Sequence, residues 1–388
     1  MTAPAASART RRLDAIGTSL WVLAWLVVSV MVARDPERRS VTPVFHLASE
    51  RWAARHDLYS DPRGYHYLPQ FALLFAPFHA LPVPSGDVLW RGLSILTVLA
   101  GLAALARRGR PSDPGRAYFV AALLALAPCL GAVRNGQTNL AFGGICLLLA
   151  AALSAGRWNA AALGIVLLVA LKPLGLVLAL LAPWPYPKLR LPLFVGLAVL
   201  ATLPFFAAPP AYAMAQYRSA AAHLAGWSGT TENRFADLTA LLRAGGFSLS
   251  PRGSLALRAA AGVATLALWL RAAARTREPF RALTLVLLAT VYLMLFNPMT
   301  EKNSYAIVAP ALALAAAVLL AAGPTRRAGL FLAAVLVSVG VLPELLWRAT
   351  RDFGLWWDPL SLAAVAIFFT VAIVRRGTVF PSGGAAAP

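Results

Sequence analysis

The sequence predicts an all-α, polytopic bundle of transmembrane helices. Hydrophobic residues make up 59% of the 388 residues and charged residues only 13%, whereas a soluble domain carries roughly 25% charged residues. Apolar blocks long enough to span a bilayer, which takes about 20 residues each, follow one another along the chain. The few polar residues inside this apolar sequence fall in three short clusters. We therefore expect one membrane domain of about 11–13 segments with a single polar site.

The spans are predicted from apolar runs that are separated by charged or turn-forming residues. They cover 15–33, 88–106, 117–133, 139–155, 158–171, 174–183, 191–208, 255–272, 281–297, 304–322, 328–346 and 359–374. Residues 66–82 are apolar but contain Pro69 and Pro77, which predicts a short kinked span or a re-entrant or interfacial element. The chain then divides into a cytoplasmic N-terminal tail (1–14), a transmembrane domain (15–375) and a disordered cytoplasmic C-terminal tail (376–388).

The positions of the arginines predict how the spans are oriented. The net charge is +20, but the basic residues cluster in short loops, as the positive-inside rule expects, and we exclude nucleic acid as a partner. If 158–183 forms a hairpin that turns at Lys172, twelve crossings leave both termini inside. All three polar clusters then lie on the extracytoplasmic side. The Ala-, Arg- and Leu-rich composition indicates a bacterial inner membrane, with the polar side facing the periplasm or exterior.

The first polar cluster is Arg134-Asn135-Gly136-Gln137-Thr138-Asn139, which joins two predicted spans. One interpretation is structural, because Gly136 permits a tight turn and Asn139 can cap the next helix. The other is functional, because Gln137 and Asn139 can donate to sugar hydroxyls or phosphate oxygens at a helix N-terminus, where anions bind readily. Arg134 is a further candidate for the phosphate.

The second and third clusters carry the remaining charges. Lys172, followed by Pro173, lies inside a long apolar stretch, where it either snorkels to the interface or pairs with a phosphate. Glu301 either pairs with Lys302 or caps the next helix, or it is a catalytic base beside a phosphate-binding Lys302. The neighbouring Asn303 is a candidate for substrate contact.

Two long loops are predicted on the extracytoplasmic side. Residues 34–65 include 43–55, which has the mixed polarity of an amphipathic surface helix. Residues 209–254 include Asn233 and Arg234, a composition that suits a polar lid over a substrate. Tyr67 belongs either to an aromatic belt at the interface or to a surface that stacks on sugars.

No cofactor or metal site is expected. Cys129 and Cys146 lie in apolar segments and are predicted to be packing residues. The five histidines show no pair at the helical spacing of metal ligands.

Several short motifs occur in a characteristic order between Val41 and about Pro310. They are Phe45 and Ala48, Asp57-Leu58-Tyr59, Tyr67-Leu68-Pro69-Gln70, Phe71 to Pro77, Leu81-Pro82, Trp90, Gly136-Gln137-Thr138-Asn139 and Lys172-Pro173. In order and spacing these motifs resemble glycosyltransferase family 87. The resemblance implies a GT-C-like membrane fold with a long first extracytoplasmic loop. It also implies an inverting transfer of a hexose, most commonly mannose, from a polyprenyl-phosphate carrier to a lipid or glycan acceptor, with membrane lipids as further partners.

The chain departs from the family pattern at two positions. The catalytic Asp of the family falls on Val41, and Gln70 stands where a second proline is expected. The base is then another carboxylate, for which the candidates are Asp35, Glu37, Asp57, Asp61 and Glu301. The alternative is a protein that binds or transports a lipid-linked sugar without transferring it, and a scaffold without ligand is the third possibility.

Overall fold

The computed structural model describes residues 3–61, 64–109, 113–227, 235–346 and 353–380, which are helical with no strand among them. The first helices are α1 (Ala3–Arg34), α2 (Thr42–Ala53), α3 (Pro69–His79), α4 (Val83–Arg108), α5 (Pro114–Asn135), α6 (Thr138–Ser154), α7 (Trp158–Leu171), η1 (Pro173–Gly175), α8 (Leu176–Leu181), η2 (Pro187–Leu189) and α9 (Arg190–Ala207). The remaining helices are α10 (Pro210–Trp227), α11 (Leu238–Ala244), α12 (Pro251–Arg275), α13 (Phe280–Phe296), η3 (Lys302–Ile307), α14 (Ala309–Ala321), η4 (Gly323–Thr325), α15 (Arg326–Leu346) and α16 (Phe353–Arg376).

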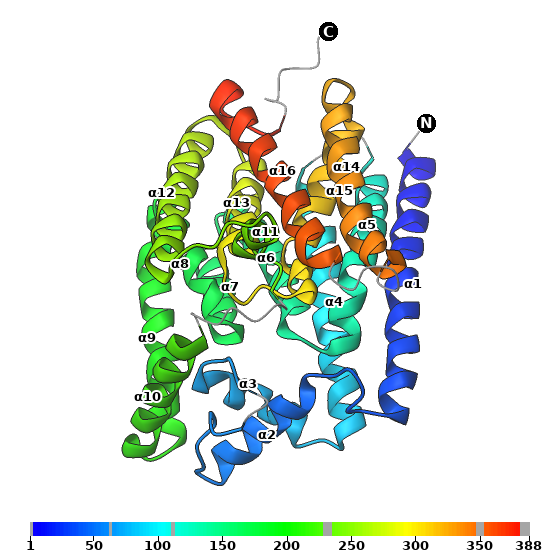
Figure 1. Cartoon of the computed structure of the whole chain (residues 1–388). Helices are drawn as coiled ribbons and strands as arrows, with labels where there is room; N and C mark the ends of the chain where they lie inside the picture. Colours follow the sequence, from blue (N-terminus) through cyan, green and yellow to red (C-terminus); the bar gives the residue numbers. More distant parts are fainter. Residues whose placement is uncertain (1–2, 62–63, 110–112, 228–234, 347–352, 381–388) are drawn as a thin grey trace.

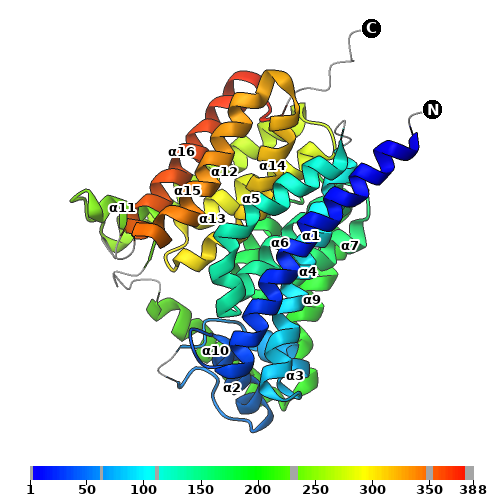
Figure 2. The ribbon, with the colours of Figure 1, turned by 90° about the vertical axis from the view of Figure 1, so that its right-hand side faces the viewer.

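The prediction of a polytopic transmembrane bundle is confirmed. Seven of the described helices are long and apolar enough to cross a membrane, and four shorter apolar helices accompany them. The start of α1 and the end of α16 lie at the same end of the bundle, at the top of Figure 1, which we call the terminal end. Figure 2 shows that α1 and α5 run along one side of the bundle. The segment 158–183 is broken at Lys172, as predicted, into α7 and the short α8.

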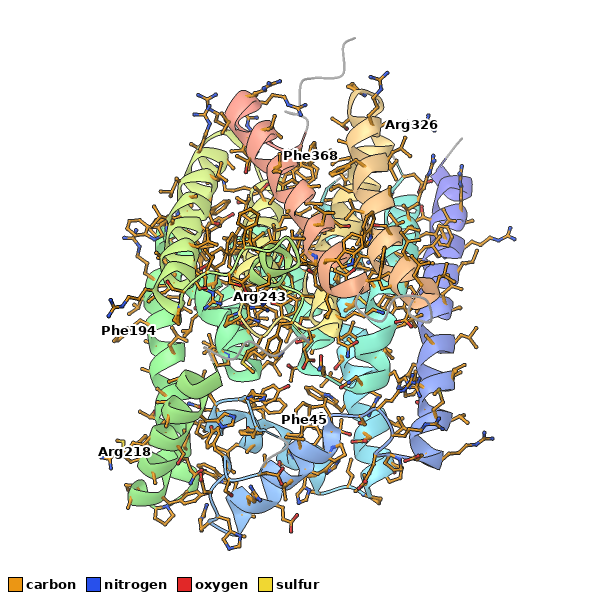
Figure 3. The ribbon with its side chains drawn as sticks, in the orientation of Figure 1. Phe45, Phe194, Arg218, Arg243, Arg326 and Phe368 are labelled. Carbon is orange, nitrogen blue, oxygen red and sulfur yellow. The ribbon has the colours of Figure 1, made fainter. Side chains whose placement is uncertain are left out.

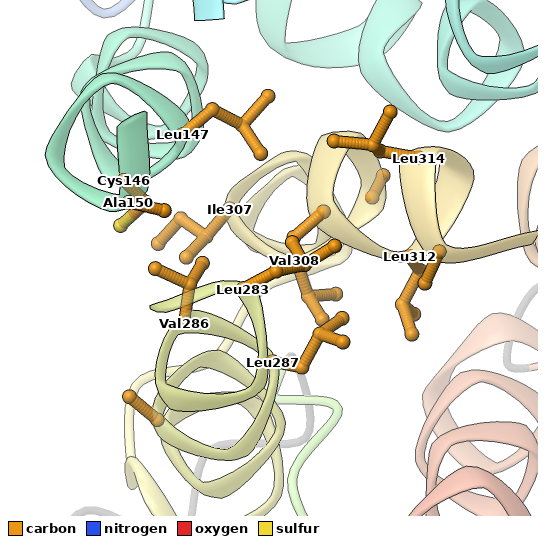
Figure 4. Close-up of a cluster of buried hydrophobic side chains, with 14 of the residues drawn as sticks. Cys146, Leu147, Ala150, Leu283, Val286, Leu287, Ile307, Val308, Leu312 and Leu314 are labelled. Carbon is orange, nitrogen blue, oxygen red and sulfur yellow. The ribbon is translucent and has the colours of Figure 1, made fainter. Parts of the chain in front are cut away.

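The core of the bundle is built from small and aliphatic side chains. Figure 4 shows one part of it, where Cys146 of α6 meets aliphatic residues of α13 and α14. Both cysteines are fully buried and unpaired, which confirms the prediction that they are packing residues. Gly144 allows α6 to approach α4 closely, because a Cβ there would lie 2.5 Å from the backbone nitrogen of Val98. This close packing fixes the ends of the helices that carry the polar clusters.

A separate layer covers the end of the bundle opposite the termini. This distal layer consists of α2, α3, the loop between them and α10, at the bottom of Figure 1. Phe45, labelled in Figure 3, is fully buried at its centre and makes edge-to-face contacts with Tyr67, Phe71 and Trp90. The tyrosines of this loop therefore form a core in place of an interfacial aromatic belt, and the belt interpretation was wrong. α3 contacts α2, α4 and α9, and with 11 residues it does not form a span.

The described residues of the two predicted tails are helical or packed against the bundle. α1 begins at Ala3, so the expected N-terminal tail is a helical extension of the first span. Beyond α16, Phe380 is buried and its ring stacks on Phe280 with 4.7 Å between the centroids. The first residues of the expected C-terminal tail are therefore packed against the bundle, and residues 381–388 lie outside the described part of the chain.

Candidate functional site

The three polar clusters meet between the bundle and the distal layer. Lys172 Nζ donates to Asn139 Oδ1 at 2.7 Å, Asn139 Nδ2 donates to Gln137 Oε1 at 2.5 Å, and Gln137 Nε2 donates to Glu301 Oε2 at 2.9 Å. We call these four residues the polar chain. The ammonium at one end and the carboxylate at the other allow one orientation of the two amides, since each amide oxygen accepts and each nitrogen donates. A cation and a carboxylate are thus held at the two ends of a fixed line of hydrogen bonds.

The turn between α5 and α6 carries the two amides of the polar chain. Gly136 ends α5 in the left-handed region with φ 73°, which favours glycine. Its carbonyl accepts a hydrogen bond of 2.7 Å from Trp90 Nε1. Gln137 is extended and precedes α6, so its side chain leaves the helix end toward Glu301. The structural and functional interpretations of this cluster are therefore compatible, because the turn that Gly136 permits is what presents Gln137.

Lys172 lies at the break between α7 and η1. Its backbone is extended, with φ −157° and ψ 142°, and Pro173 starts the next short helix. The ammonium lies 5.9 Å from the centroid of the Tyr67 ring, within range of a cation–π contact. Among the described residues Lys172 forms no ion pair, and its one hydrogen bond is to the neutral amide of Asn139. Its charge therefore remains available to an anion that reaches the break.

Glu301 opens the short helix η3. It forms a capping box with Ser304, whose hydroxyl accepts from the backbone nitrogen of Glu301 at 3.1 Å. Its side chain is exposed, and its second contact is the hydrogen bond to Gln137. The expected pair with Lys302 does not form, because Lys302 Nζ lies 2.5 Å from Glu344 Oε1 of α15. Glu301 is thus a fixed, solvent-accessible carboxylate, whereas Lys302 is turned away from the polar chain.

The other predicted bases lie elsewhere. Asp57 accepts from the backbone of Tyr59, Asp61 pairs with Arg51 at 3.7 Å, and Asp35 accepts from the backbone of Arg38. Glu37 is exposed in the turn that follows α1. None of the four contacts the polar chain in the described structure. Of the five candidate bases, the structure brings Glu301 alone to the predicted site.

The remaining predicted residues surround the polar chain at different distances. Tyr67 lies beneath Lys172, and Asn303 packs against Gly131 at the end of α5. Arg134 is half-buried, and its backbone carbonyl accepts from Arg91 at 3.1 Å. Asn233 and Arg234 lie outside the described residues.

A buried ionic cluster that the sequence did not reveal supports the turn. Thr42 Oγ1 donates to Asp87 at 2.6 Å, His46 Nε2 lies 3.0 Å from the other carboxylate oxygen, and Arg91 pairs with Asp87 at 3.5 Å. Arg91 also donates to the backbone carbonyls of Val133 and Arg134, which end α5. We call this cluster the clamp. A carboxylate and an arginine four residues apart at the start of an apolar span were the signal that could have identified it.

Val41 lies next to this arrangement. Its backbone nitrogen donates to the carbonyl of Asn135 at 2.9 Å, and its side chain packs on the aromatic core of the distal layer. The position where the family carries its Asp is therefore beside the turn that holds Gln137. Glu301 also reaches this turn, through its hydrogen bond with Gln137.

Burial changes the proton affinity of groups in the distal layer. It raises the pKa of the Tyr67 hydroxyl, which stays neutral near neutral pH. It lowers the pKa of His66 to about 4, and the nearby His223 adds to this effect. The ring nitrogens of these two histidines lie 3.0 Å apart. Among the described residues no group of three His, Cys, Asp or Glu side chains could hold a metal ion.

Comparison with known proteins finds a matching family and a similar solved structure. The sequence model of glycosyltransferase family 87 matches residues 65–298, and no curated protein matches the chain. A solved structure of ArnT from Cupriavidus metallidurans, bound to undecaprenyl phosphate, is similar at a TM-score of 0.48 and 16% identity. That likeness covers 93% of this chain and 76% of ArnT.

Proposed function

Because the chain belongs to glycosyltransferase family 87, we propose that it takes a hexose from a polyprenyl-phosphate carrier, with mannose as the first candidate for the sugar. The acceptor is a hydroxyl of a lipid or glycan, and the transfer inverts the configuration at the anomeric carbon. The observation that carries this proposal is the polar chain, which fixes one available cation and one exposed carboxylate in a single site.

Lys172 is the residue that we assign to the phosphate of the carrier. When the bond between the anomeric carbon and the phosphate oxygen breaks, negative charge grows on the phosphate. A preorganised cation at that point stabilises the transition state more than the ground state. The apolar residues on both sides of Lys172 and the break at Pro173 suit a ligand whose tail stays in the bilayer.

Glu301 is the residue that we assign to the acceptor. The acceptor oxygen attacks the anomeric carbon, its proton passes to the Glu301 carboxylate, and the polyprenyl phosphate leaves with the electron pair of the broken bond. Gln137 orients the carboxylate through its amide nitrogen at 2.9 Å. Attack on the face opposite the leaving phosphate is a single displacement, which gives inversion.

The distribution of charge supports a site on the extracytoplasmic face. α4 ends at Arg108, α15 begins at Arg326 and α16 ends at Arg376, and these helix ends lie at the terminal end, whereas the polar chain lies where the bundle meets the distal layer. Figure 3 shows Arg326 at the terminal end and Phe194 pointing outward from α9, as expected for a bilayer-facing residue. The positive-inside rule places such an arginine-rich end in the cytoplasm. In a bacterial inner membrane the polar chain then faces the periplasm.

The test is transfer of radiolabelled mannose from polyprenyl-phosphate mannose to membrane acceptors by the purified protein. We expect Glu301→Gln to lower kcat by about 10²–10⁴ and Lys172→Gln by about 10²–10³, with both proteins folded. Glu50→Gln removes an exposed carboxylate from α2 of the distal layer and serves as the matched control. Unchanged transfer in both site variants would refute the assignment.

The same assay decides between the enzyme and a non-catalytic binder. A binder predicts no transfer by the unaltered protein, together with saturable binding of the carrier that is lost in Lys172→Gln. Transfer that depends on Glu301 excludes this alternative, because binding alone does not need a base.

A further inference from the structure

A groove opens near the terminal end of the bundle, on the side of the membrane opposite the polar chain. It has a volume of about 320 Å³ and lies between α4, α6 and α7. Its walls are mostly alanine and leucine side chains, among them Ala104, Ala152 and Leu163. Leu163 is 57% exposed, so the groove opens outward from the bundle, where hydrocarbon surrounds a membrane protein.

Two arginines line this apolar groove. Arg108 ends α4, and Arg157 immediately precedes α7, so both lie at the level where the helices leave the membrane. Among the described residues neither guanidinium has a hydrogen bond or an ion pair. The neighbouring Arg107 differs, because it pairs with Asp14 at 2.9 Å. The groove is thus apolar along its walls and carries two unneutralised charges near the membrane surface.

We propose that this groove binds an anionic glycerophospholipid. Its phosphodiester lies between Arg108 and Arg157, and one acyl chain lies along the alanine and leucine walls. Guanidinium groups bind phosphate oxygens with paired, charge-assisted hydrogen bonds, and basic pockets between transmembrane helices are typical sites for anionic headgroups. The site is independent of sugar transfer, because Lys172 and Glu301 are at the other end of the bundle.

The shape of the groove favours a lipid over a soluble phosphate. A free phosphate would contact only the arginines, so the apolar walls of the groove would contribute nothing to its binding free energy. A phospholipid satisfies both parts of the site, since its headgroup meets the arginines and its chain meets the walls. The small side chains of Ala152 and Ala160 provide the space that the chain occupies.

The experiment is native mass spectrometry of the purified full chain, titrated with phosphatidylglycerol or with phosphatidylcholine of the same acyl chains. We expect preferential binding of phosphatidylglycerol, and a roughly 30-fold loss of its affinity in the double variant Arg108→Gln/Arg157→Gln. This factor corresponds to about 1 kcal/mol for each arginine at the membrane surface. The matched control, Arg326→Gln/Arg327→Gln, removes two exposed arginines from the same end outside the groove and should leave the affinity unchanged.

A second variant tests the acyl chain separately from the charges. Ala160→Phe fills the groove at an exposed position, keeps both arginines, and should lower the affinity for phosphatidylglycerol without lowering the unfolding midpoint. Equal binding of the two lipids, or an equal loss in the control, would overturn the proposal. Displacement of the lipid by inorganic phosphate or by polyprenyl phosphate would assign the arginines to another ligand and overturn it as well.

Discussion

Replacing Gly136 by alanine tests the link between the clamp and the polar chain. Gly136 has φ 73°, which costs a residue with a side chain about 1–2 kcal/mol. A Cβ would also lie 2.8 Å from both Arg91 Nη2 and Thr42 Cγ2, and such overpacking adds about 1–3 kcal/mol. We therefore expect Gly136→Ala to lower the free energy of unfolding by about 2–5 kcal/mol. Sugar transfer should fall by about 10²-fold, because the clamp cannot move without shifting the turn that presents Gln137.

Gly246 offers a matched control for the backbone term. It has φ 84°, but no atom lies within 4 Å of the position of its Cβ. Gly246→Ala should therefore lose only the about 1–2 kcal/mol of backbone strain and keep its transfer activity. The unfolding of both variants is measured in the same detergent, alongside mannose transfer. Equal stability and equal activity of the two variants would refute the claim that Gly136 is packed against the clamp.

Three further predictions follow from buried or neighbouring charges. Asp87→Asn breaks a fully buried ion pair and should lower the free energy of unfolding by about 3–5 kcal/mol. Glu344→Gln breaks an exposed pair and should lower it by only about 0–1 kcal/mol. Equal losses in the two variants would argue against the burial of Asp87. His66 has a pKa of about 4 in the folded protein and 6.5 in the unfolded chain, so the unfolded chain binds the proton first. The stability that neutral His66 contributes is present above pH 6.5 and lost toward pH 4. His66→Gln should therefore weaken the dependence of the unfolding midpoint on pH between pH 4 and 6.5, and an unchanged dependence would contradict the prediction. Val41→Asp in the Glu301→Gln background should restore part of the mannose transfer, because position 41 lies beside the same turn. No restoration would mean that a carboxylate at position 41 does not reach the reacting groups.

The meeting of the three polar clusters could be predicted from the sequence. Polar side chains inside apolar spans are costly, so they are expected at helix ends and breaks that share one face of a bundle. Counting spans from the arginine-rich loops placed the clusters at 137, 172 and 301 at one end, and the structure joins them by direct hydrogen bonds. The number of crossings is right only if the chain turns back at Lys172. One unbroken helix over 158–183 would remove a crossing and put Glu301 at the opposite end.

The partners of individual charges could not be predicted in the same way. Lys302 was expected beside Glu301, but Glu344 lies 42 positions later and approaches it only when α15 packs on the bundle. The sequence does not mark Asp87 and Arg91 as a buried pair, because position 87 stands at the start of an apolar run, where an exposed carboxylate is ordinary. Its burial is set by the distal layer, and α2 brings Thr42 and His46 over it through contacts that local sequence does not encode.

The two ends of the polar chain differ in exposure in the way that the proposed reaction needs. Asn139 is fully buried, Gln137 and Lys172 are half-buried, and Glu301 is exposed. The cation therefore lies at a helix break beside apolar residues, where a carrier with a hydrocarbon tail arrives through the bilayer. The carboxylate faces solvent, where the hydroxyl of a polar acceptor arrives. Two substrates of opposite polarity could then approach from different directions, and the amides between them would keep the proposed base and the proposed phosphate site at a fixed separation.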